Sequence, residues 1–196
     1  LSLTNWHPIT EHCNLEVICI QRRMWISYFA GLVIFLGVSP VAHATVEILA
    51  DNQKNKTLFA STTYFLQGQV IVLAGNTLTI QKGTTIYATP SFLDKSTVLI
   101  VEQGAKIVAE GTKDEPITFT TARPTNSTQY KGLWGGIIIC GKAPISSVTG
   151  TNEVEGLTLD SLGGGGFTYG GSDAIDNSGI LKYVRIWHGG GDLMGG

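Results

Sequence analysis

Apolar and polar residues follow the same order in two short stretches of the chain, residues 78–86 (LTIQKGTTI) and 99–107 (LIVEQGAKI). Each begins with alternating apolar residues, continues through two polar residues and a glycine, and returns to isoleucine. The alternation predicts a half-buried β-strand, and the polar residues with the glycine predict a turn. The copies are offset by 21 residues (99 − 78), a period typical of solenoids, in which each repeat is one structural unit.

We expect the two copies to stack as neighbouring coils of about 21 residues, with parallel strands about 4.8 Å apart. Their identical residues would then form ladders inside the solenoid. Gly83 and Gly104 would occupy the same corner, where a positive φ or a close approach of backbone excludes a side chain. Gly111 is predicted to be a further turn glycine. The pattern therefore predicts an all-β solenoid of parallel strands.

The rest of the chain divides into segments around this repeat. Residues 45–61 are polar in their second half and are expected to cap the first coil, since a solenoid must cover its open ends. Residues 62–196 are expected to form the solenoid itself, with further coils beyond Gly196 because the pattern ends midway. The periodicity fails over residues 146–176, which are predicted to form a protruding glycine-rich loop. Additional strands are expected at 64–73, 117–121, 132–141 and 180–187.

The first 44 residues have the composition of an upstream extension followed by a secretory signal peptide. Two arginines precede an apolar run over residues 25–38, and a small-x-small pattern predicts cleavage after Ala44. The alternative is a membrane anchor, but about 14 apolar residues fall short of the roughly 20 that span a bilayer. Cys13 and Cys19 lie before the cut, so Cys140 alone remains and the mature chain has no intrachain disulfide. We therefore expect an exported protein without a membrane span.

Charge argues against one class of partner. The formal net charge is −2, charged residues make up 14% of the chain, and no cluster of basic residues occurs. A nucleic-acid-binding protein would carry a basic patch or stripe. Nucleic acid is therefore not an expected partner.

Several motifs resemble those of a known group of proteins: the secreted right-handed parallel β-helix proteins of Gram-negative bacteria, within the pectate-lyase-like superfamily. The segments that carry the resemblance are 64–68, 78–84, 99–112, 116–120, 132–137 and 178–186. It implies a right-handed parallel β-helix and a location in the periplasm, on the outer surface or outside the cell. These motifs consist of turn and ladder residues, so they indicate the fold and do not specify an activity.

Polysaccharide lyases with this fold carry acidic calcium ligands and a basic proton abstractor on neighbouring coils. In the predicted register Glu102 lies over Gln81 and Glu110 lies over Thr89, so no acidic column forms. The best candidates for calcium ligands are Asp173, Asp176 and Asp192. They lie in glycine-rich sequence, whose carboxylate and carbonyl oxygens suit this ion. The alternative is that residues 176–179 form a turn held by side-chain-to-backbone hydrogen bonds.

Three aromatic residues are candidates for a sugar-stacking platform, namely Trp134, Tyr169 and Trp187. An aromatic ring offers a flat apolar face that suits the apolar face of a pyranose. The alternative is that the two tryptophans pack over glycine backbones at corners, since both lie beside glycines.

Two functions follow from these observations. The first is an exported, non-catalytic β-helix scaffold that binds glycan or a cell-envelope partner. The second is a calcium-dependent polysaccharide lyase or glycoside hydrolase with its site near Asp173 and Asp176 or in further coils. Aligned outward carboxylates beside a lysine or arginine would distinguish the enzyme.

Overall fold

The computed structural model describes residues 45–196 except 51, 91–95, 124–130, 158–166 and 194–196. Every regular element in this part is a β-strand, and all but two of the strands belong to three parallel sheets. The first sheet contains β1 (Thr45–Leu49), β4 (Thr62–Leu66), β7 (Thr85–Ala88), β10 (Ile117–Thr121) and β15 (Val184–Ile186). The second contains β2 (Asn52–Gln53), β5 (Gln69–Val72), β8 (Val98–Val101) and β11 (Gly136–Ile139). The third contains β3 (Lys56–Leu58), β6 (Thr77–Ile80), β9 (Lys106–Glu110) and β14 (Gly179–Lys182).

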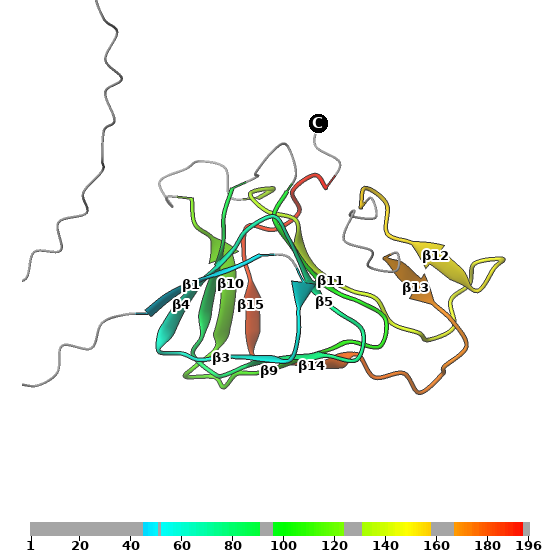
Figure 1. Cartoon of the computed structure of the whole chain (residues 1–196), viewed down its shortest axis with the longest axis horizontal. Helices are drawn as coiled ribbons and strands as arrows, with labels where there is room; N and C mark the ends of the chain where they lie inside the picture. The colour runs from blue at the N-terminus through cyan, green and yellow to red at the C-terminus, as the bar shows by residue number, and fades with distance from the viewer. Residues whose placement is uncertain (1–44, 51, 91–95, 124–130, 158–166, 194–196) are drawn as a thin grey trace, which may run out of the picture. The chain divides into compact units, whose positions relative to one another are not determined.

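The chain visits the first, second and third sheets in turn and then begins again, so each coil adds one strand to every sheet. The three sheets enclose a common core, as Figure 1 shows. Alternate residues point inward, for example Leu78 and Ile80 on β6, which are 1% and 2% exposed. This is a parallel β-helix, and the predicted fold class is confirmed.

The two repeated stretches do not stack on each other, and this part of the prediction was wrong. Leu78 pairs with Ile107, and Leu99 pairs with Val70. The first copy runs from the third sheet to the first, whereas the second runs from the second sheet to the third. Gly83 and Gly104 therefore lie at different corners. Every corner joins two strands through a turn, so the same motif recurs at successive corners. The motif alone therefore does not show to which of the three sheets its strands belong.

The spacing between stacked residues also grows along the chain. Lys56 pairs with Leu78, a spacing of 22 residues (78 − 56) that is close to the predicted coil. Leu78 pairs with Ile107, a spacing of 29 (107 − 78), because the connection between β7 and β8 is longer. In the observed register Glu110 lies beside Lys182 rather than in line with Thr89.

Residues 45–61, predicted to be a cap, contain the first coil itself, since β1, β2 and β3 pair with β4, β5 and β6. The predicted signal peptide and its cleavage site lie outside the described residues. Within those residues, no helix is long and apolar enough to cross a membrane.

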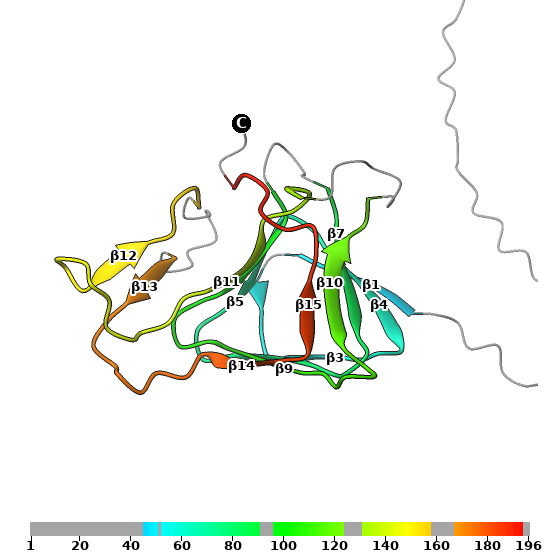
Figure 2. The same ribbon diagram turned by 180° about the vertical axis from the view of Figure 1, so that it is seen from behind.

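The glycine-rich segment 146–176 contains an antiparallel pair of strands, β12 (Thr151–Glu153) and β13 (Thr168–Gly170). Both views place this pair beside the coils, near β11 (Figures 1 and 2). Phe167, which is 6% exposed, packs with Ile71 and Ile100 in a second apolar cluster. These isoleucines alternate with the core-facing residues of β5 and β8, so they lie on the outer side of the second sheet. The segment was predicted to protrude: Phe167, Val154 and Leu157 pack on this face, whereas Val148 and Ile175 are 106% and 90% exposed.

Candidate functional site

The outer face of the first sheet carries a column of four large apolar or aromatic side chains, interrupted by one threonine. Ile48 pairs with Phe65, Phe65 with Tyr87, and Tyr87 with Thr120. Trp187 continues the column, because its N–H donates to Phe119 O at 2.9 Å, one position beyond the pair of Phe119 and Ile186. The Phe65 and Tyr87 rings stack with centroids 5.6 Å apart, and Trp187 is 50% exposed. We call these five residues, Ile48, Phe65, Tyr87, Thr120 and Trp187, the aromatic column.

A column of hydroxyl groups runs beside the aromatic column on the same face. Thr85 pairs with Thr118, and Thr118 pairs with Arg185. Thr63 precedes the pair of Tyr64 and Ile86 and continues this column toward β1. The face therefore presents aromatic rings, hydroxyl groups and, at β15, a guanidinium group.

Strand β15 is short and lies between two residues with unusual backbone angles. Tyr183 has a φ of 49° and His188 a φ of 62°, the only positive values for residues other than glycine in the described part of the chain. Such conformations cost roughly 1–3 kcal/mol each and tend to occur at functional sites. The two strained residues lie on either side of the segment that carries Arg185 and Trp187.

The side chain of Trp187 is positioned by its neighbours. The guanidinium carbon of Arg185 lies 5.8 Å from the ring centroid, within the range of a cation–π interaction. The His188 ring meets the indole edge-on, with centroids 6.3 Å apart. The Nδ1 atom of His188 also lies 3.0 Å from the Thr120 hydroxyl oxygen, which ties the group to β10.

The other two predicted platform residues lie elsewhere. Trp134 is fully buried, stacks on Phe119 with centroids 6.4 Å apart, and donates its ring N–H to Trp187 O at 2.7 Å. Its ring is buried in the core and has no face open to a ligand. Tyr169 is half-buried on β13, in the pair of strands that flanks the second sheet. The three residues do not form one platform.

The predicted calcium ligands Asp173 and Asp176 act as turn residues. Asp173 accepts the N–H of Ile175 at 3.1 Å. Asp176 accepts the N–H of Lys142 at 2.9 Å and the Ser178 hydroxyl at 3.1 Å. The N–H of Lys142 holds the pKa of Asp176 below its ordinary value, and the Ser178 hydroxyl acts in the same direction.

Asp192 does not join this pair. Its backbone carbonyl accepts the hydroxyl of Ser96, two residues before β8, whereas Asp176 lies beside Gly141, beyond the end of β11. Because β8 and β11 pair in parallel, these are opposite ends of the second sheet. The described residues contain no group of three or more His, Cys, Asp or Glu side chains close enough to hold a metal ion.

The three predicted turn glycines meet two different requirements. Gly83 and Gly104 have φ values of 77° and 80°, a conformation that glycine adopts without steric cost. At Gly111 the requirement is space, because a Cβ atom would lie 2.7 Å from Tyr183 O.

Cys140 is a core residue, 1% exposed. Burial raises the pKa of its thiol, and the charge of Glu102 raises it further. A thiol that is buried and kept protonated is a poor nucleophile.

A family model described as a pectate-lyase-like beta helix domain matches residues 50–195. No curated protein and no solved structure matches the chain.

Proposed function

Because the chain belongs to the family of pectate-lyase-like β-helix domains, we propose that it is an exported, non-catalytic scaffold that binds glycan. The binding surface is the outer face of the first sheet. The observation that carries this proposal is the aromatic column, which runs across successive coils to Trp187, between the strained residues Tyr183 and His188.

The chemistry of this face suits a sugar chain. A pyranose has an apolar face of C–H groups that packs on an aromatic ring, and hydroxyl groups around its edge that need hydrogen-bond partners. Trp187 and Tyr87 supply rings, while Thr85 and Thr118 supply hydroxyls that both donate and accept. Arg185 adds a planar fork of donors at one end.

The other two sheets offer less. The second sheet buries its outer isoleucines under the segment that contains Phe167. The third sheet presents Val108 beside Ile180 and Thr79, without a ring in that column. Of the three faces, the first alone combines open aromatic and hydroxyl groups among the described residues.

Export is the second part of the proposal. It is supported by the apolar run at residues 25–38 with its small-x-small ending at Ala44. The glycan, or a cell-envelope component that carries one, would then be met in the periplasm, on the outer surface of a Gram-negative bacterium or outside the cell.

Binding to a panel of neutral and acidic polysaccharides, by affinity electrophoresis and calorimetry, tests the function. Trp187→Ala is expected to weaken binding by about 2 kcal/mol, roughly 30-fold, as for aromatic anchors of other interfaces. The substitution leaves the Trp187 carbonyl, which accepts from Trp134, in place. Ile180→Ala is the matched control, since Ile180 is 46% exposed and lies on the third sheet. This variant should bind the polysaccharides as the unaltered protein does.

Two results would refute the proposal. A folded protein that binds none of the polysaccharides, or equal losses for Trp187→Ala and Ile180→Ala, would exclude the first sheet as the glycan site. Release of unsaturated or reducing sugars from any polysaccharide, with or without calcium, would show catalysis and overturn the non-catalytic part.

A further inference from the structure

The end of the β-helix formed by β1, β2 and β3, here called the N-terminal mouth, has polar residues at positions that face the core in later coils. Glu47 pairs with Tyr64, which pairs with Ile86. Lys56 pairs with Leu78. The later residues in both columns are buried, at 0–1% exposure.

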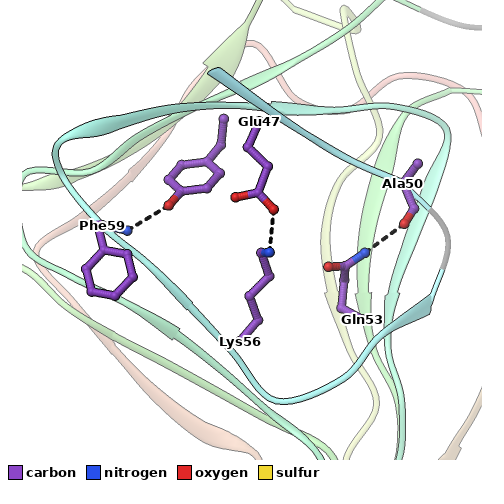
Figure 3. Close-up of polar contacts among 6 residues, drawn as sticks. Glu47, Ala50, Gln53, Lys56 and Phe59 are labelled. Carbon is purple, nitrogen blue, oxygen red and sulfur yellow. Dashed lines mark hydrogen bonds and ion pairs between the residues drawn. The ribbon is translucent and has the colours of Figure 1, made fainter. Parts of the chain in front are cut away.

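The second sheet contributes a third polar residue to this mouth. Gln53 pairs with Val72, which is fully buried in the core. The first strand of each sheet therefore carries an inward polar residue, and we call Glu47, Gln53 and Lys56 the mouth cluster. Figure 3 shows these side chains directed into the area enclosed by the first coil.

The mouth cluster is held by internal contacts. The Lys56 ammonium and a Glu47 carboxylate oxygen form an ion pair, with side chains 29% and 39% exposed (Figure 3). The Gln53 amide donates to Ala50 O at 2.7 Å, and the Tyr64 hydroxyl below accepts the Phe59 N–H at 2.9 Å. The ion pair joins β3 to β1 across the first coil and remains partly hydrated, whereas the other two contacts are local.

An apolar mouth would be an assembly surface. Strands β1, β2 and β3 are the end strands of their sheets, so each has one edge without a partner strand among the described residues. Such edges pair readily with another chain. Inward leucines at the mouth would add an apolar face that a second copy could cover, whereas charges must first be dehydrated, at a high cost.

We propose that the mouth cluster is an assembly-blocking cap, which prevents a second copy of this chain from stacking on the N-terminal mouth. The ion pair satisfies both charges within one copy and offers a partner only the cost of removing their water. This role is independent of the glycan-binding face, which lies on the outer side of the first sheet.

Sedimentation velocity and light scattering over a wide concentration range test the cap in the full chain. E47L/K56L is expected to self-associate at a concentration about tenfold or more below that of the unaltered protein. The near-isosteric E47Q/K56M should shift in the same direction, and the charge exchange E47K/K56E should leave association unchanged. Circular dichroism and a cooperative thermal transition establish that each variant is folded.

The matched control is a second ion pair, Lys82 with Glu115, whose side chains are 56% and 51% exposed. K82L/E115L adds the same apolar groups away from the mouth and should not change association. The proposal is overturned if folded E47L/K56L and E47Q/K56M associate as the unaltered protein does. It is also overturned if K82L/E115L associates as strongly as E47L/K56L.

Discussion

Phe167 anchors the segment that covers the second sheet, and Phe167→Ala should release it. Its ring is 6% exposed and packs with Ile71, Val98 and Ile100. Truncation of a buried phenylalanine costs about 3–5 kcal/mol. The loss applies to the attachment of the segment, because the inward residues of β5 and β8 pack in a separate cluster. The equilibrium constant for opening of the segment should therefore rise about 100-fold or more, while the coils stay folded.

Amide hydrogen exchange measures this opening at two reporter positions. The N–H of Gly170 donates to Gly141 O at 2.9 Å, and that of Asp173 donates to Lys142 O at 3.1 Å. Both amides should exchange faster in Phe167→Ala, while the core strand amides keep their protection. Ile175→Ala is the control in the same segment and should leave this protection unchanged, since Ile175 is 90% exposed. Unchanged protection at Gly170 and Asp173, or equal acceleration throughout the core, would refute the reasoning.

Two further predictions concern the core and a corner. Gly111→Ala should lower the thermal midpoint of unfolding, because the new Cβ would lie 2.7 Å from Tyr183 O and 3.0 Å from Ile117 N; a midpoint equal to that of the unaltered protein would contradict this close contact. Above the ordinary thiol pKa of about 8.5, the free energy of unfolding should fall as pH rises, because the raised pKa of Cys140 makes the unfolded chain lose its proton first. Urea unfolding at neutral and alkaline pH should show a weaker fall for Cys140→Ala, and equal slopes would argue against this linkage.

The fold could be predicted from the sequence because strand and corner chemistry is local. Alternation in residues 78–80, or the apolar run in residues 99–101, followed by a glycine with positive φ, marks a strand and its corner wherever it occurs. The register could not be predicted, because it depends on connection length. The connection after β7 moved the partner of Leu78 from Leu99 to Ile107, and with it every comparison between outward residues.

The first coil shows the same limit at a finer scale. Its alternation suggests that Val46 and Ile48 face inward, yet they are 61% and 62% exposed and Glu47 points toward the core. The register is set by Leu49, which pairs with Leu66 and is 2% exposed. A one-residue shift would turn every side chain of β1 to the other face. Glu47 and Lys56 look like ordinary surface residues until the pairing of β1 with β4 and of β3 with β6 is known.

The sequence could identify a candidate site residue only where neighbouring residues in the chain distinguish it. Trp187 could be singled out as an aromatic residue beside glycine, but Phe65 and Tyr87 join it only through the pairing of β4, β7 and β10. Trp134 has a similar glycine-rich sequence context and lies in the core. Composition near a tryptophan does not show which side of the sheet its ring occupies.

The connections that lengthen the coils also account for the difference between the three faces. The long excursion between β11 and β14 folds back over the second sheet and buries its outer side. Connections from the third sheet to the first are short, and only Tyr183 separates β14 from β15. A corner of one residue leaves no room for an insertion that could cover β15, and it requires the positive φ that Tyr183 adopts. The strain at this corner therefore follows from the direct passage from the third sheet to the first.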